Sequence, residues 1–226
     1  MTRTGAISHM EDTDRHWKLW GELNPQRGNC YRHVSDDQFW LSGQLYTSWI
    51  LQQLSGLYPS SEHCTALDFG CGVGRILKPL SLRYEHVTGV DVSPAMLKHA
   101  HRNVPNAELL EHIPSGRRFD LVHSYLVLQH IPVHRGLDIV NQLRQCVAPG
   151  GLLALHVPLQ VHHSLIYRIK HAIPASRFLF NLLQGKPLRE PLTQPNAYPL
   201  TRMCEILDPV RIIPHIANSV FFCGNY

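Results

Sequence analysis

Three glycines and two acidic residues have types and spacings that could do chemistry. Gly70, Gly72 and Gly74 follow a short apolar run that contains Asp68, and Asp91 ends a second apolar run 23 positions after Asp68. Glycines allow a tight turn, and they let a ligand approach the backbone where a Cβ would clash. An acid about 20 residues further along the chain can reach a ribose diol in open α/β folds. The loop and the two acids therefore predict a single ligand site.

The glycine spacing distinguishes this loop from the loops that bind dinucleotides. A dinucleotide fingerprint has the form G-x-G-x-x-G, but the sixth position counted from Gly70 is Arg75. An acid followed by G-x-G-x-G resembles motif I of the class I S-adenosylmethionine-dependent methyltransferases. The resemblance extends from about residue 64 to residue 158 and is strongest at residues 66–93. It implies that the cofactor is S-adenosyl-L-methionine.

The resemblance also implies which residues would bind this cofactor. Its ammonium and sulfonium groups suit loop carbonyls and the Asp68 carboxylate, whereas Asp91 would accept both ribose hydroxyls. An isolated Asp at a strand end is more often a helix cap or a solvated turn, but two motifs together favour the cofactor. We assign Glu111 to the adenine amino group. The residues expected at the cofactor are Asp68, Gly70, Cys71, Gly72, Gly74, Asp91, Val92, Glu111 and Ser124.

Two histidines are candidates for a general base. The methyl group of this cofactor is already activated, so a base is useful only when the acceptor is a hydroxyl. His130 follows the fourth predicted strand and is the first candidate, and His156 near the end of the fifth is the second. A histidine in such a segment is more often a packed, hydrogen-bonded side chain. If His130 is the base, turnover should rise with pH through an apparent pKa near 6 to 7.

Apolar runs and helical spacings predict an α/β fold. The resemblance implies a seven-stranded, mostly parallel sheet in the order 3-2-1-4-5-7-6, with the last strand antiparallel and helices on both faces. The segment 112–118 is barely long enough to recross a sheet, so the third strand should be short or the crossover extended. The expected strands are residues 64–69, 86–91, 107–111, 119–124, 151–158, 210–217 and 219–226.

The chain is expected to divide into a helical N-terminal part and one methyltransferase domain. Residues 1–14 should be disordered, residues 15–60 should form a helical cap, and residues 61–226 should form the domain. An insert at 159–198 should act as a lid or recognise the acceptor. Ser35 and Gln38 read as a capping box that begins a helix. Trp17, Trp20, Phe39 and Trp40 could form a lid over the acceptor, although core packing is the commoner role.

Composition limits the classes of protein that fit this chain. Its 226 residues, 44% of them hydrophobic, suit one globular domain. No apolar stretch approaches a membrane span and the first ten residues lack a signal-peptide core, so we expect a cytoplasmic protein. The six cysteines form no C-x-x-C pair, so reduced thiols are expected. The histidines have no partners at ligand spacing, so no metal site is expected.

The net charge of +4 comes from the region after residue 158. Such an excess could attract an acidic substrate, a phosphate backbone or a membrane surface, although a solvated basic face is as common. The segment that begins at Ser124 lacks the motif of enzymes that methylate base amines. We therefore expect methyl transfer to an oxygen or nitrogen of a small molecule, with nucleic acid disfavoured and the oligomeric state unknown. A non-catalytic cofactor-binding protein and an RNA methyltransferase are the alternatives.

Overall fold

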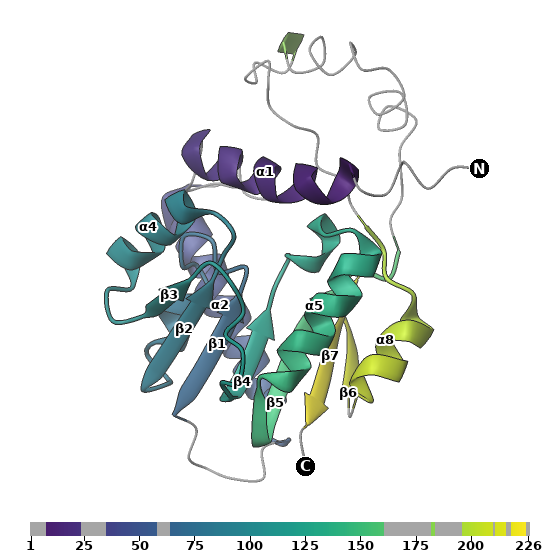
Figure 1. Ribbon diagram of the computed structural model, residues 1–226. Helices are drawn as coiled ribbons and strands as arrows, with labels where there is room; N and C mark the ends of the chain where they lie inside the picture. Colours follow the sequence, from purple (N-terminus) through teal and green to yellow (C-terminus); the bar gives the residue numbers. More distant parts are fainter. Residues whose placement is uncertain are drawn as a thin grey trace, which may run out of the picture.

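The structure is a computed structural model that describes residues 8–23, 35–57, 64–160, 182–183, 196–209, 211–215 and 218–224. These residues form a sheet with helices on both faces (Figure 1). The helices are α1 (Ser8–Leu23), α2 (Asp36–Leu54), α3 (Leu77–Leu80), α4 (Pro94–Asn103), the short 3-10 helix η1 (Leu128–His130), α5 (Val133–Gln145) and α8 (Leu200–Leu207). The strands are β1 (Thr65–Phe69), β2 (His86–Val90), β3 (Glu108–Leu110), β4 (Phe119–Ser124), β5 (Val147–Val157), β6 (Arg211–His215) and β7 (Asn218–Gly224).

The strand order confirms the predicted topology. The seven-stranded sheet runs β3-β2-β1-β4-β5-β7-β6. Strands β3, β2, β1, β4 and β5 pair in parallel, whereas β7 is antiparallel to both β5 and β6. The order reverses between β1 and β4, and ligands of open α/β sheets bind beyond the carboxyl ends of the strands at such a point. The topology alone therefore locates the expected site.

Two hydrophobic clusters fill the two faces of the sheet. Leu67 of β1 belongs to the cluster that packs against α5 and α8. Its neighbour Ala66 belongs to the cluster that includes residues of α2 and α3. Successive side chains of a strand point to opposite faces, so each central strand contributes to both clusters. Figure 1 shows α5 and α8 together over one face, with α2 behind the sheet.

Two helix starts have the capping bonds that their local sequence favours. The Ser35 hydroxyl accepts from the Gln38 N–H at 3.3 Å, and the Gln38 side chain accepts from the Ser35 N–H at 3.1 Å, which completes the capping box. Ser93 caps α4 by accepting from the Met96 N–H at 3.4 Å, and Pro94 occupies the first helical position. Local sequence therefore sets where α2 and α4 begin.

Helix α1 begins at Ser8, which lies inside the range 1–14 that the sequence suggested would be disordered. The helix lies across the end of the sheet at which the strands lead into the glycine loop (Figure 1). Asp14 of α1 makes an ion pair with Arg135 of α5. The polar first turns have no apolar pattern of their own. Arg135, the partner of Asp14, lies more than 100 residues away in sequence, so local signals could not identify the start of this helix.

Several connections differ from the sequence-based boundaries. β3 has three residues, and residues 111–118 form bends and turns without a helix, as the short crossover required. β5 begins at Val147 rather than at Gly151, because the Pro149–Gly150 turn is taken up as an irregularity in the pairing with β4. Most of the predicted insert 159–198 lies outside the described residues. Its last residue, Tyr198, is buried and donates its hydroxyl to the carbonyl oxygens of Leu128 and Ile131.

Candidate active site

The loop between β1 and α3 presents its backbone to an open space. Gly70, Gly72 and Gly74 have φ angles of +75°, +54° and +91°. A Cβ on Gly70 would clash with the side chain of Val127, so only glycine fits there. A Cβ on Gly72 would meet no atom within 4 Å, and Gly72 lines a cavity. The loop thus has the bare surface expected where a ligand approaches the main chain.

Asp91 follows β2 and is bonded to the glycine loop. Its Oδ2 accepts from the Gly72 N–H at 2.9 Å, and its Oδ1 accepts from the Ser93 N–H at 2.9 Å. Burial raises the pKa of this carboxyl to about 6, while the two backbone hydrogen bonds act in the opposite direction. A group with this pKa is largely ionised at neutral pH, and a carboxylate has lone pairs beyond the two in use. Asp91 can therefore accept from hydroxyl groups in the cavity.

Asp68 also lines the cavity and is paired with a residue that the sequence analysis did not identify. The parallel register of β1 and β4 places Asp68 beside His123. Oδ1 of Asp68 lies 2.9 Å from Nδ1 of His123, and both side chains are almost completely buried. Nε2 of His123 lies 3.4 Å from the Tyr46 hydroxyl of α2. The acid of the loop motif is thus part of a buried polar chain.

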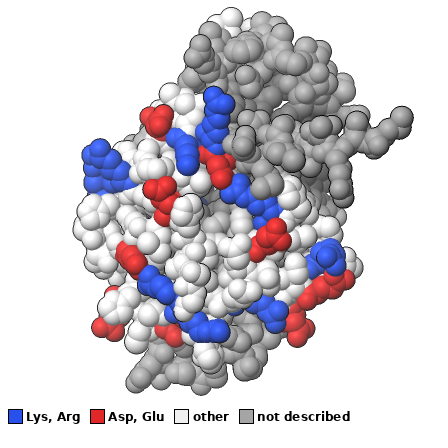
Figure 2. Space-filling view, viewed as in Figure 1, with Lys and Arg blue, Asp and Glu red and all other residues white. Residues whose placement is uncertain are grey.

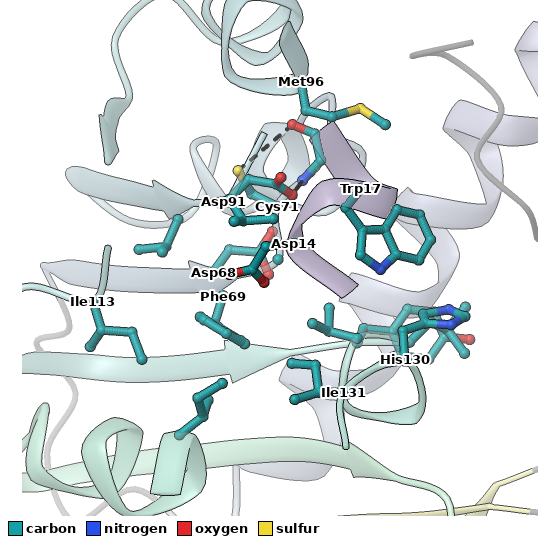
Figure 3. Close-up of a pocket in the computed structure, with 18 of the residues that line it drawn as sticks. Asp14, Trp17, Asp68, Phe69, Cys71, Asp91, Met96, Ile113, His130 and Ile131 are labelled. Carbon is teal, nitrogen blue, oxygen red and sulfur yellow. Dashed lines mark hydrogen bonds between the residues drawn. The ribbon is translucent and has the colours of Figure 1, made fainter. Parts of the chain in front are cut away.

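The cavity has a volume of about 580 Å³, within the roughly 300–1,000 Å³ typical of small-molecule sites. Figure 3 shows Asp68, Cys71 and Asp91 on one side of it, with Trp17 and His130 on another. Most of the residues expected at the cofactor line this space, namely Asp68, Gly70, Cys71, Gly72, Asp91, Val92 and Glu111. Burial and the nearby Asp91 and Asp68 raise the pKa of the Cys71 thiol, which keeps it neutral.

Two of the expected residues support the wall of the cavity and do not line it. The Ser124 hydroxyl donates to the Phe69 carbonyl oxygen at 3.0 Å, so it fastens the end of β4 to the end of β1. Gly74 faces Val104 at the end of α4, where a Cβ would lie 3.3 Å from the valine side chain. Ser124 and Gly74 were predicted to contact the cofactor because of their positions in the sequence motifs. In the structure Ser124 contacts β1 and Gly74 lies against the end of α4, and neither residue lines the cavity.

Helices α1 and α5 supply further walls that sequence reasoning largely missed. Asp14 and Arg135 join the two helices through two hydrogen bonds of 2.7 Å. The lining residues share one face of each helix, and this helical spacing is the signal that could have identified them. They are Thr13, Asp14, Trp17 and Lys18 on α1, and Arg135, Asp138, Ile139 and Gln142 on α5.

The aromatic residues considered as a lid divide between the cavity and the core. Trp17 and Phe39 line the cavity. Trp20 is buried with 3% of its surface exposed, and Trp40 packs edge-on against Phe39 at 5.2 Å between ring centroids. Only two of the four residues can therefore contact a ligand in the cavity.

Arg75 is a cation at the cavity wall that the sequence analysis left without a role. Its side chain is buried, and its guanidinium carbon lies 5.4 Å from the ring centroid of Tyr125 and 5.7 Å from that of Phe39. Nη1 donates to the Ser42 hydroxyl at 3.3 Å. A guanidinium has five donors in a fixed plane, so Arg75 can also bind an anionic group in the cavity.

His130 lines the cavity but does not have the properties of a general base. Burial, together with the nearby His16, lowers its pKa to about 3, so the ring is neutral at physiological pH. Its Nε2 lies 3.0 Å from the amide nitrogen of Gln129, which makes Nε2 the acceptor. Trp17 packs edge-on against the ring at 4.8 Å. The expected rise of turnover through pH 6 to 7 cannot come from a group with this pKa.

His156, the second candidate, does not line the cavity. It lies in the middle of the sheet with 1% of its surface exposed and packs edge-on against Tyr125, whose ring does reach the cavity. The alternation of β5 places it on the same face as Ala154, inside the core. A group in this position can act on a ligand only through Tyr125.

The described residues give little support to the other classes of site. Among them no group of three or more His, Cys, Asp or Glu side chains could hold a metal ion, and no helix has the length and apolar character to cross a membrane. Five cysteines in this part of the chain are free thiols, while Cys30 lies outside it. Basic and acidic side chains are interspersed on the face in Figure 2. Arg202 and Glu205 form an ion pair at 2.6 Å.

Comparison with known proteins identifies the domain that carries the site. Residues 67–155 match the family described as a methyltransferase domain. Trans-aconitate 2-methyltransferase of Paracidovorax citrulli is 29% identical over 176 residues, which cover 74% of this chain and 63% of that protein. The corresponding protein of Variovorax paradoxus is 32% identical over 114 residues, or 47% and 43% of the two chains. The chain thus spans less than two thirds of the length of these relatives.

Solved structures share the fold at low sequence identity. Magnesium protoporphyrin IX methyltransferase from Synechocystis PCC 6803, solved with bound S-adenosylhomocysteine, has a TM-score of 0.59 at 15% identity, covering 96% of this chain and 97% of that one. An O-methyltransferase family protein from Burkholderia thailandensis has a TM-score of 0.54 at 15% identity, with coverages of 100% and 75%. At this identity the comparison concerns the fold, which includes the described N-terminal helices.

Proposed function

Residues 67–155 of this chain belong to the class I S-adenosylmethionine-dependent methyltransferases, and from this premise we propose that the protein transfers a methyl group from S-adenosyl-L-methionine to a small molecule. The observation that carries the proposal is the open glycine loop bonded to Asp91 at the edge of a cavity of about 580 Å³. The expected acceptor atom is an oxygen or a nitrogen. Of the residues that the sequence predicts at the cofactor, only those that line this cavity have a role in the proposal.

The groups around the cavity complement this cofactor along its length. Asp91 would accept from the ribose hydroxyls, and Val92 and Glu111, which also line the cavity, would contact the adenine. Asp68 would accept from the ammonium, and the buried Arg75 would donate to the carboxylate. When bound, the cofactor supplies a methyl group on a sulfonium. The part of these residues is to hold the cofactor in one orientation in a site with little water.

The acceptor atom is proposed to arrive without a proton that must be removed. Two of the described histidines line the cavity, His112 and His130. His130 is neutral with a pKa near 3, and its Nε2 accepts from Gln129. Such a ring is a poor base for a hydroxyl, because a general base works best with a pKa near the operating pH. A carboxylate oxygen or a neutral amine needs no base. The relatives named for trans-aconitate, a carboxylic acid, favour the carboxylate.

An assay with cofactor labelled in the methyl group tests the proposal and the acceptor chemistry together. Purified protein is incubated with labelled S-adenosylmethionine and a panel of small carboxylic acids that includes trans-aconitate. We expect S-adenosylhomocysteine to form in step with a labelled product. A methyl ester releases volatile methanol in alkali, whereas an amine or ether product keeps its label. An alkali-stable product would contradict the carboxylate assignment.

Two alternatives predict different results in binding assays. A non-catalytic cofactor-binding protein would bind S-adenosylhomocysteine and yield no labelled product with any acceptor. An RNA methyltransferase would retain RNA on a filter with a steep dependence on salt, because phosphate contacts release counterions. Most of the basic residues that suggested this second alternative lie outside the described residues. We expect weak RNA binding that does not compete with S-adenosylhomocysteine.

A further inference from the structure

Asp68 lines the cavity, and His123 and Tyr46 continue from it as a buried chain; these two residues have no role in the function proposed above. We propose that His123 is a positioning residue which, with Tyr46, directs the Asp68 carboxylate toward the ammonium group of a zwitterionic ligand. That ammonium would be the one on the methionyl part of the cofactor. The inference deepens the proposed function and rests on it.

The sheet register creates the first link of the chain. Asp68 of β1 and His123 of β4 are paired residues on neighbouring parallel strands, so their side chains project from the same face. The Nδ1–Oδ1 distance is 2.9 Å, and the side chains are 1% and 3% exposed for His123 and Asp68. Among the described residues, the hydrogen bond from His123 engages Oδ1 of the Asp68 carboxylate. Oδ2 is the oxygen that remains for a ligand.

The chemistry of the three groups assigns the hydrogens. An ionised carboxylate can only accept, so Nδ1 of His123 carries the hydrogen that points to Asp68. With Nδ1 as the donor to Asp68, Nε2 is the ring atom that can accept from the Tyr46 hydroxyl at 3.4 Å. Each group in the chain thus determines the orientation of the next, from α2 through β4 to β1.

Packing holds the outer end of this chain in place. Tyr46 is buried in α2, and its ring stacks on Tyr125 with centroids 3.6 Å apart and planes inclined by 22°. Tyr125 in turn lines the cavity and lies under the guanidinium of Arg75. Rotation of the Tyr46 side chain would therefore disturb the stack, so its hydroxyl is held toward His123. Helix α2 thus contributes to the site indirectly through Tyr46, in addition to Phe39, which lines the cavity itself.

A buried carboxylate needs partners, and the cavity offers a place for one. Burial of an ionised carboxylate is strongly unfavourable unless hydrogen bonds and an opposite charge compensate it. His123 supplies one hydrogen bond, and a ligand ammonium would supply both a second and the charge. This argument predicts that His123 affects ligands with an ammonium and leaves other ligands of the same cavity unaffected.

Two ligands separate this role from a general structural one. S-adenosylhomocysteine contains the ammonium, whereas 5′-methylthioadenosine keeps the ribose and adenine but lacks the amino-acid part. Affinities for both are measured by calorimetry on the full chain and on His123→Asn, His123→Gln and Tyr46→Phe. The asparagine amide can occupy the place of Nδ1 and preserve the bond to Asp68. The longer glutamine amide reaches instead toward the place of Nε2.

The expected result is selective for ligand and for variant. His123→Gln should weaken S-adenosylhomocysteine roughly tenfold or more, as expected for a hydrogen bond involving a charged group, while 5′-methylthioadenosine changes less than about twofold. His123→Asn should keep both affinities within about threefold of wild type. Tyr46→Phe should weaken only S-adenosylhomocysteine, by about threefold, because its effect is indirect.

Equal losses for the two ligands in His123→Gln would overturn the proposal and leave His123 a purely structural residue. Unchanged binding of S-adenosylhomocysteine in that variant would also overturn it. Failure of the wild-type protein to bind either ligand would instead contradict the proposed function. If thermal melting shows that His123→Gln is unfolded, the test uses Tyr46→Phe instead. Its affinities for S-adenosylhomocysteine and for the deaminated analogue of that ligand are then compared. The proposal then requires a smaller preference for the ammonium-bearing ligand than wild type has.

Discussion

The backbone N–H of Gly72 donates to Oδ2 of Asp91 across 2.9 Å, so the loop after β1 and the end of β2 form a single unit. This bond explains why the glycine motif and the second acid act together although 19 positions separate them. A hydrogen bond to an ionised group is stronger than one between neutral groups. Removal of the Asp91 carboxylate would therefore break a bond that shapes the loop and, in the proposed function, would also remove a ligand contact.

Asp91→Ala should weaken binding of S-adenosylhomocysteine by about 1.5 to 3 kcal/mol, because hydrogen bonds to the ribose hydroxyls involve a charged group. Isothermal titration calorimetry measures the difference. Glu85→Ala is the control, since it removes an exposed carboxylate that does not line the cavity. Equal affinities of wild type and Asp91→Ala would exclude the ribose contact.

Binding of S-adenosylhomocysteine should depend on pH through Asp91. Burial raises the pKa of this carboxyl to about 6, and the ionised form is the one that accepts from two hydroxyls. A ligand that prefers the ionised form binds with full affinity above pH 6 and progressively less well below it, by up to about tenfold per pH unit. Calorimetry between pH 5 and pH 8 should show this decline in wild type. The decline should disappear in Asp91→Asn, whose amide does not titrate.

Gly70→Ala and Gly72→Ala form a matched pair. The added Cβ at Gly70 would clash with Val127, so we expect a loss of about 2 to 3 kcal/mol in the free energy of unfolding. At Gly72 the Cβ points into open space and the positive φ costs about 1 kcal/mol, so this variant should fold. Its affinity for S-adenosylhomocysteine should nevertheless fall. Thermal melting and calorimetry separate the two effects, and a stable Gly70→Ala would contradict the packing argument.

His130→Gln should retain most of the wild-type turnover on a carboxylate acceptor, with a loss of less than about tenfold. The ring is neutral with a pKa near 3, so its titration contributes no rise in rate between pH 6 and pH 7. Initial rates across that pH range test both statements. A loss of 100-fold or more in His130→Gln, with unchanged binding of S-adenosylhomocysteine, would restore His130 as a proton-transfer residue.

The Asp14–Arg135 pair should couple α1 to α5 by about 1 kcal/mol or less, because both side chains are partly exposed. A double-mutant cycle with Asp14→Asn and Arg135→Gln measures this coupling from thermal or denaturant unfolding. Since both residues line the cavity, each single variant should also raise the dissociation rate of S-adenosylhomocysteine. Strictly additive effects on unfolding would show that the pair does not contribute to the position of α1.

Local sequence determined those features that depend on a few neighbouring residues. Ser35 and Ser93 specified helix starts through their own capping bonds, and Gly70 specified a backbone conformation that other residues rarely adopt. The strand order followed from the resemblance to a known family. Asp91 could be placed because a strand end and the glycine loop meet at the same edge of a parallel sheet.

Tertiary structure decided which side chains share the cavity and in what state. His123 looks like an ordinary strand residue until the pairing of β4 with β1 brings it beside Asp68. His130 lines the cavity, and its low pKa arises from burial and from His16, more than 100 residues earlier. The sequence therefore determined the glycine loop, its acids and the family. Only the packed structure decided the partners and the pKa values, because both depend on groups that are distant in sequence and adjacent in space.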